Sequence, residues 1–127
     1  MFPKSSTIVI CVIGGLHLLF MLGELFPWPS PFIMDKVLEK WPERLDLSPA
    51  DRRFAATVVH NAGIYNGIVA AGLFAAASLG PAGLSVQLAL LAGGVAAGIF
   101  GAATLTPATI VQAIAGGIAI VAVLYTT

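Results

Sequence analysis

Two ionisable side chains interrupt the first long apolar run of the chain. His17 and Glu24 are seven residues apart, so on a helix they lie two turns apart along nearly the same line. An imidazole and a carboxylate on one face can exchange protons, ligate a metal ion, or form hydrogen bonds to a neighbouring helix. Both groups are costly in apolar surroundings, so each needs a partner or a function.

Polar residues also interrupt the later apolar runs. Counted inward from the charged segment that follows the first run, they lie about one to three helical turns deep, at the level of His17 and Glu24. They should therefore form one layer where the helices meet. The predicted intramembrane polar cluster comprises His17, Glu24, His60, Asn61, Tyr65, Asn66 and Gln112.

The favoured role of this cluster is structural. A neutral His17 is expected to hydrogen-bond a polar residue of another helix, which contributes roughly 0.6–2 kcal/mol per bond within a bilayer. Its candidate partners are Asn61, Tyr65 and Gln112. Glu24 lies nearer the surface, where it either pairs with Arg52 or Arg53 or has a functional role.

Two functional alternatives remain open for the same groups. His17, Glu24 and His60 are suitable ligand types for Zn, Fe or Cu, although their spacing matches no known metal motif. A pathway for protons or small solutes would also use them. No cofactor is predicted, because the sequence has no glycine-rich phosphate loop, serine elbow or paired cysteines, and Cys11 is expected to be an inert buried thiol.

The composition places the chain in a membrane. Of its 127 residues, 58% are hydrophobic and only 9% are charged, whereas soluble domains carry about 25% charged residues. Ten of the twelve charged residues lie between Asp35 and Arg53, and residues 54–127 contain none. A net charge of zero and a single cysteine argue against nucleic-acid binding and a disulfide scaffold. The sequence predicts one integral membrane domain, residues 1–127.

Proline and glycine divide the apolar sequence into four spans. A bilayer core of roughly 30 Å needs about 20 helical residues. Gly80-Pro81 and Thr106-Pro107 mark turns, with Thr106 as an N-cap and Pro107 as the first helical residue. A cleaved signal peptide is the alternative for the first span, but no small-residue cleavage pattern follows it. The predicted fold is an all-α four-helix transmembrane bundle with spans at residues 7–26, 54–79, 84–105 and 107–125.

The charged segment between the first two spans predicts a short amphipathic interfacial helix. Apolar residues within 32–42 fall on one helical face and charged residues on the rest. Trp28 and Trp41 are expected at headgroup depth. The sequence Ser48-Pro49-Ala50-Asp51 has the N-cap, proline and acid of a helix start, so the second helix begins before the bilayer core.

Basic residues set the predicted orientation. Five lysines and arginines lie between the first two spans, including Arg52 and Arg53 at the headgroups, whereas the other side carries only Lys4. By the positive-inside rule the loop of residues 27–50 is cytoplasmic, and both termini lie on the opposite side of the cell (inner) membrane. Gln87 is expected near that opposite surface, in contact with headgroups.

Small residues recur at helical spacing within the spans. Helices in a bilayer associate through close backbone approach, which small residues four apart permit. The predicted helix-packing residues are Gly63, Gly67, Gly94, Gly98 and Gly101. They either pack the bundle internally or dock a partner protein or a second copy, and the sequence leaves both open.

Four blocks of sequence resemble one known family. They are Gly-Glu-Leu-Phe-Pro-Trp after His17, residues 60–67, residues 98–104, and Gln112. In this order and spacing they are similar to a family of small four-helix bacterial integral membrane proteins, the domain of unknown function 1304 family. The chain departs from it at Ala62, where the family usually has glutamine, near Ala115, where it usually has proline, and in its longer loop. The resemblance implies the architecture and the polar cluster, but no reaction.

The sequence favours a non-enzymatic role. We expect an accessory or assembly subunit, because small-residue faces are present while a catalytic set and a sizeable extramembrane domain are absent. Its expected partners are the lipid bilayer and other membrane protein subunits or a second copy, with no nucleic acid. A small proton-coupled transporter using Glu24 is the alternative, since the chain also looks like the small multidrug-resistance exporters. The one-sided distribution of basic residues opposes this alternative, because it sets a single orientation.

Overall fold

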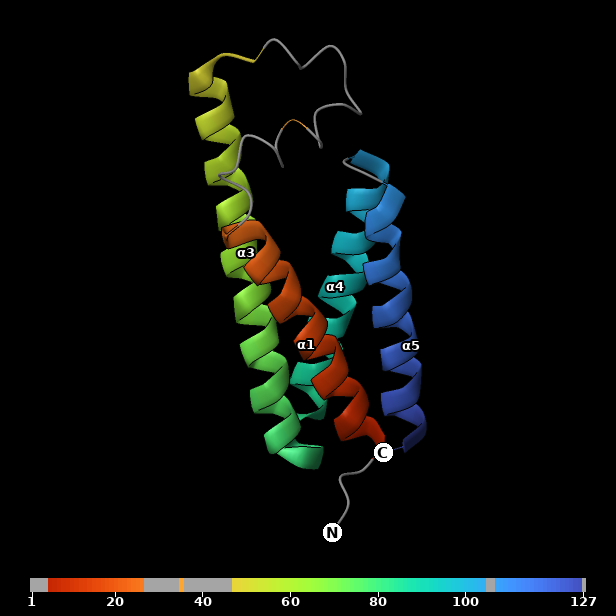
Figure 1. Ribbon diagram of the computed structural model, residues 1–127. Coiled ribbons are helices and arrows are strands. Elements are labelled where there is room, and N and C mark those ends of the chain that lie inside the picture. The colour runs from red at the N-terminus through yellow and green to blue at the C-terminus, as the bar shows by residue number, and fades with distance from the viewer. Residues whose placement is uncertain (1–4, 27–34, 36–46, 105–106, 127) are drawn as a thin grey trace. The chain divides into compact units, whose positions relative to one another are not determined.

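The described part of the chain folds into helices. The computed structural model describes residues 5–26, 35, 47–104 and 107–126 (Figure 1). These residues form the α-helices α1 (Ser5–Leu25), α3 (Pro49–Ser78), α4 (Leu84–Thr104) and α5 (Ile110–Thr126) and the 3-10 helices η2 (Gly80–Gly83) and η3 (Pro107–Thr109). Since the described part of the chain contains no strand, the predicted all-α fold is confirmed.

Three of the helical segments are long and apolar enough to cross a membrane. They are Ser6–Leu25, Pro49–Ser78 and Gly80–Thr104. The fourth, Ile110–Thr126, is apolar but has only 17 residues. The chain is therefore a membrane protein, and each predicted span overlaps one observed helix.

The structure divides into two compact units, and α1 and α3 contribute to both. The first unit comprises Met1–Leu16 and Val69–Thr127, so it contains all of α4 and α5. The second unit comprises His17–Ile68, with the later part of α1 and the earlier part of α3.

A capping box fixes the start of α3 in the second unit. The backbone N–H of Asp51 donates to Oγ of Ser48 at 3.2 Å, and the backbone N–H and hydroxyl of Ser48 donate to the Asp51 carboxylate at 3.1 and 2.6 Å. The acid also lies in the first turn, where the helix dipole favours negative charge. The predicted helix start at Ser48-Pro49 is confirmed.

A glycine turn joins α3 to α4 in the first unit. Gly80 has a φ of 57°, a left-handed conformation that glycine adopts without a steric penalty. Pro81 follows it within η2. Gly83 then lies so close to the carbonyl oxygen of Ala76 that a β-carbon at this position would overlap it. The turn predicted at Gly80-Pro81 is confirmed.

Gln87 is buried, so the expectation that it contacts headgroups is wrong. Its Nε2 donates to the carbonyl oxygen of Ala76 at 3.0 Å, and the residue is only 6% exposed. Ala76 lies in the last turn of α3, where carbonyl groups have no N–H donor within the helix. The Gln87 side chain therefore completes the end of α3.

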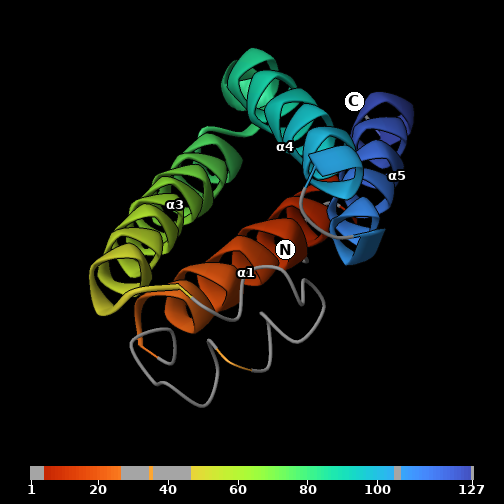
Figure 2. The ribbon, with the colours of Figure 1, turned by 90° about the horizontal axis from the view of Figure 1, so that it is seen from above.

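In the first unit, α4 and α5 lie side by side (Figures 1 and 2). A β-carbon at Gly98 would lie 2.5 Å from the backbone nitrogen of Ala113, so the glycine permits this close approach. The hydroxyl of Thr109 donates to the Gly98 carbonyl at 3.3 Å. α5 begins at Ile110 instead of the predicted Pro107, because residues 107–109 form the tighter turn η3. The predicted N-cap, Thr106, lies outside the described residues.

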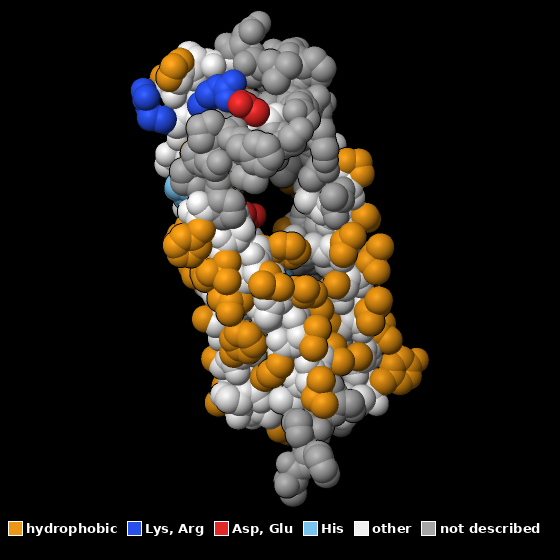
Figure 3. Space-filling model, in the orientation of Figure 1, with side chains coloured by type: hydrophobic (Ala, Val, Ile, Leu, Met, Phe, Trp, Pro, Cys, Tyr) orange, Lys and Arg blue, Asp and Glu red, His pale blue; other side chains and the backbone are white. Residues whose placement is uncertain are grey.

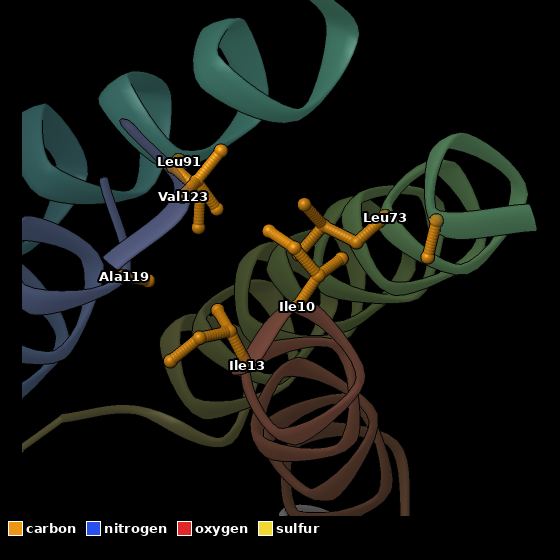
Figure 4. Close-up of a cluster of buried hydrophobic side chains, with 7 residues drawn as sticks. Ile10, Ile13, Leu73, Leu91, Ala119 and Val123 are labelled. Atoms are coloured by element: carbon orange, nitrogen blue, oxygen red, sulfur yellow. The ribbon is translucent and has the colours of Figure 1, made fainter. Parts of the chain in front are cut away.

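A small apolar cluster forms the core of the first unit (Figure 4). Ile10, Leu73, Ala119 and Val123 are completely buried, and Leu91 is 1% exposed. α1, α3, α4 and α5 each contribute to this cluster, and Ile13 and Ala77 complete it. Close packing of small and branched side chains is what holds helices together in lipid, where burial of apolar surface gives no driving force.

Large apolar side chains are exposed on both units, and many are visible on the face drawn in Figure 3. Phe54, Phe100 and Ile118 are 71%, 70% and 64% exposed. A surface of this kind suits lipid contact and not water. Cys11 is also exposed, so the expectation that its thiol is buried is wrong.

Candidate functional site

Hydrogen bonds join α1 to α3 in the second unit. Nδ1 of His17 lies 2.8 Å from Oδ1 of Asn66, and Nδ2 of Asn66 donates to Oε2 of Glu24 at 2.7 Å. One amide on α3 thus bridges the two ionisable groups of α1. We call His17, Asn66 and Glu24 the bridged triad.

The direction of these hydrogen bonds follows from the chemistry of the carboxylate. An ionised Glu24 can only accept, so it faces the NH₂ group of Asn66. The amide oxygen of Asn66 then faces Nδ1 of His17. The Asn66 side chain therefore donates to Glu24 through its NH₂ group and presents its oxygen to His17.

The bridged triad is held by close packing around it. His17 is only 4% exposed, and its ring meets the edge of Phe20 with the centroids 6.1 Å apart. A β-carbon at Gly63 would lie 3.1 Å from Cβ of Glu24, and one at Gly67 would lie 2.6 Å from Sδ of Met21. These two glycines let α1 and α3 approach closely enough for Asn66 to reach both partners.

The remaining members of the predicted polar cluster lie elsewhere. Asn61 and Tyr65 are exposed, Tyr65 by 62%, so neither is the partner of His17. Gln112 is half-buried on α5, which belongs to the first unit. His60 is half-buried, and its Nε2 is buried without a hydrogen-bond partner in the part of the chain that the structure describes. Asn61 and Tyr65 were therefore wrong as partners of His17, because Asn66 occupies that position on α3.

Charged residues near the start of α3 pair with each other. Nη1 of Arg52 lies 2.5 Å from Oδ1 of Asp35, and Arg53 is exposed. Glu24 instead accepts a hydrogen bond from Asn66. Apart from Asp35, the structure does not describe the predicted interfacial helix at residues 32–42. Trp28 and Trp41, which were expected at headgroup depth, also lie outside the described residues.

The geometry does not bring metal ligands together. Within the described ranges, no three His, Cys, Asp or Glu side chains are close enough to hold one ion. An amide stands between His17 and Glu24, and amides are weak ligands for the transition metals that imidazole favours. What the bridged triad does in this arrangement is hold α1 against α3 through two hydrogen bonds.

The predicted packing glycines are used within the chain. Gly63 and Gly67 contact α1 in the second unit, while in the first unit Gly98 contacts α5 and Gly101 contacts Thr109 of η3. Gly94 is also buried on α4. Gly63, Gly67, Gly98 and Gly101 therefore pack against other elements of the chain, which was one of the two interpretations open from the sequence.

The bridging role of Asn66 could have been found from its spacing. Gly63, Asn66, Ala70, Leu73 and Ala77 follow one another at steps of three or four residues. These steps trace one face of a helix, and the apolar members of this series are buried. Asn61 and Tyr65 are also four apart, but they lie on a different face and are exposed. The small residues around Asn66 were the signal for the face that meets α1.

Comparison with known proteins gives a family and no activity. The sequence matches the family described as "Protein of unknown function (DUF1304)" over residues 11–125. No curated protein and no solved structure matches the chain. The match runs from α1 to α5 and includes all three members of the bridged triad. The chain therefore belongs to the DUF1304 family, whose function is unknown.

Proposed function

We propose that this chain is a non-enzymatic accessory or assembly subunit that packs against the helices of another membrane protein. The observation that carries the proposal is the outward face of α4. Ala89, Gly93 and Ala97 are exposed at four-residue spacing, and nothing lies within 4 Å of the position of a β-carbon at Gly93. The small side chains of this row, which lies between the exposed Val86 and Phe100, permit close backbone approach by another helix.

The outer face of α5 provides the contrast. Its exposed residues include Val111, Ile114, Ile118 and Val121, which are 63%, 56%, 64% and 54% exposed. Bulky branched side chains suit contact with lipid tails, whereas a row of Ala and Gly permits close approach of a helix backbone. This difference supports a protein partner at the row of small residues on α4 and lipid at the outer face of α5.

Substitution at Gly93 tests this proposal. A Gly93→Leu variant should fold normally, because its side chain enters open space, yet the leucine should block close approach of a partner helix. We expect at least a tenfold loss of co-purifying membrane protein when the tagged chain is isolated in mild detergent. Gly117→Leu is the matched control, since Gly117 on α5 also has nothing within 4 Å and should retain the partner.

The outcomes of this experiment are distinct. A wild-type chain that always elutes as a free monomer contradicts the proposal, as does a Gly93→Leu variant that retains its partner in full. Recovery of a second copy of the chain alone identifies self-association, which overturns the role as a subunit of another protein.

We also propose that the chain lies in the cell (inner) membrane with residues 27–50 in the cytoplasm. Support comes from the five basic residues between α1 and the bilayer-crossing part of α3. In a chain with Cys11→Ser, a membrane-impermeant maleimide should label Ser5→Cys in intact cells. It should label Ser30→Cys only after the membrane is made permeable. The reverse pattern would show the opposite orientation.

A further inference from the structure

We propose that α3 pairs with α3 of a second copy of the chain through an outward row of five residues, which we call the α3 row. Its members recur at steps of four and three residues, as in the seam between two paired helices. All are exposed and belong to the second unit: Phe54, Val58, Asn61, Tyr65 and Ile68. Gly63 and Asn66, which contact α1, lie on the opposite side of the helix. The α3 row therefore faces away from α1.

Two polar residues in the middle of the α3 row need a hydrogen-bonding partner. Asn61 and Tyr65 lie within the helix Pro49–Ser78, which is long and apolar enough to cross a membrane, and apolar members of the row precede and follow them. Neither side chain makes a hydrogen bond to the described residues. Lipid tails offer neither donors nor acceptors, so an amide and a phenol on this face are costly until another helix pairs with them.

The chemistry of the α3 row identifies this other helix as α3 of a second copy. Copies that share one orientation are related by a two-fold axis along the membrane normal, so their α3 helices meet in parallel and each residue of the row meets its own counterpart. An amide and a hydroxyl both donate and accept, so Asn61 and Tyr65 can each bond to the same residue across the axis. The other three members are apolar, and the row contains no charged residue that would meet a like charge.

Energy transfer between copies in lipid vesicles tests this pairing. Full-length chains with Ser5→Cys and Cys11→Ser are labelled with a donor or an acceptor dye and mixed in phosphatidylcholine vesicles at varied protein-to-lipid ratios. We expect transfer that rises to the plateau of a dimer. Asn61→Leu should require on the order of tenfold more protein per lipid for the same transfer, because hydrogen bonds across the pair are lost. Asn61→Gln, which keeps the amide, should retain the pairing.

Two controls separate this effect from misfolding and from the contact proposed at α4. Detergent micelles in large excess over the chain separate the copies, so unfolding in them reports on a single chain, and Asn61→Leu should unfold there like the parent. Gly93→Leu should leave energy transfer unchanged, because Gly93 lies on α4 in the first unit. The inference thus goes beyond the proposed function and does not rest on it.

Disulfide cross-linking in the same vesicles locates the contact. In a chain with Cys11→Ser, Val58→Cys should give an oxidised dimer with copper phenanthroline, since equivalent positions of the α3 row approach each other across the axis. Ile114→Cys on α5 is the matched control. Ile114 is 56% exposed and Val58 is 53% exposed, so unspecific collisions would cross-link both variants equally.

Three results would overturn the pairing. The first is energy transfer no greater than that of randomly mixed monomers, which is expected if the α3 row contacts only lipid headgroups or a different protein. The second is equal transfer in Asn61→Leu and the parent, and the third is equal cross-linking of Val58→Cys and Ile114→Cys. The vesicles contain no other protein, so this test and the co-purification test fail independently.

Discussion

Replacement of Asn66 by leucine is expected to lower the free energy of unfolding by about 2–4 kcal/mol. Leucine has a similar size, so the main change is the loss of the two hydrogen bonds that Asn66 makes to His17 and Glu24. Both partners then remain in an apolar environment with unsatisfied polar atoms, and His17 is only 4% exposed. Unfolding by sodium dodecyl sulfate in mixed micelles, followed by circular dichroism, measures this free energy.

Asn61→Leu is the matched control for this substitution. Asn61 lies on the same helix, five residues earlier, but is exposed and makes no hydrogen bond to the described residues. Its replacement should change the free energy of unfolding by less than about 0.5 kcal/mol. Equal losses in the two variants would show that the bridged triad does not stabilise the contact between α1 and α3.

Glu24→Gln, introduced into both the wild-type chain and the Asn66→Leu variant, isolates the contribution of the hydrogen bond between Asn66 and Glu24. Glu24→Gln should cost clearly less in a chain that already carries Asn66→Leu than in the wild type, because the hydrogen bond to Glu24 is then already lost. Additive losses would mean that Asn66 and Glu24 act independently. This double-mutant cycle separates the bridge from a general effect of placing leucine in the contact between the helices.

The sequence was sufficient to predict the membrane class and the helices. Long apolar runs and breaker residues carry this information locally, as the confirmed start of α3 at Ser48-Pro49 and the turn at Gly80-Pro81 illustrate. The start of α5 was misplaced by three residues because proline fits the first turn of a 3-10 helix as well as that of an α-helix. The position of the proline alone could not distinguish a 3-10 helix from the start of an α-helix.

The polar contacts were harder to predict because they depend on which face of each helix meets a neighbour. Gln87 was assigned to the headgroups from its depth alone, yet it turns inward to the free carbonyl of Ala76. Its partner exists only because α3 ends there, which is a property of two elements together. The same reasoning explains the wrong partners for His17: depth placed Asn61, Tyr65 and Asn66 in one layer, but rotation of α3 directs Asn66 toward α1.

The second large effect is expected at Gly98. Gly98→Ala should lower the free energy of unfolding by about 1–3 kcal/mol, because the new β-carbon would lie 2.5 Å from the backbone nitrogen of Ala113 and 3.0 Å from its Cβ. A backbone atom cannot turn aside as a flexible side chain can. α4 and α5 must therefore separate, which also weakens the hydrogen bond from Thr109 to the Gly98 carbonyl.

Gly93→Ala is the matched control, and its effect should have the opposite sign. Gly93 lies five residues earlier on α4 with nothing within 4 Å, so alanine there should stabilise the helix by up to about 1 kcal/mol. The detergent titration used for Asn66 measures both variants. If both substitutions lowered the free energy of unfolding, or both raised it, the packing of α4 on α5 would be contradicted. A loss of stability for Gly98→Ala together with a gain for Gly93→Ala would show that Gly98 maintains the contact between α4 and α5. Gly93 would then not be needed for the fold and could serve the partner contact that the Gly93→Leu experiment tests.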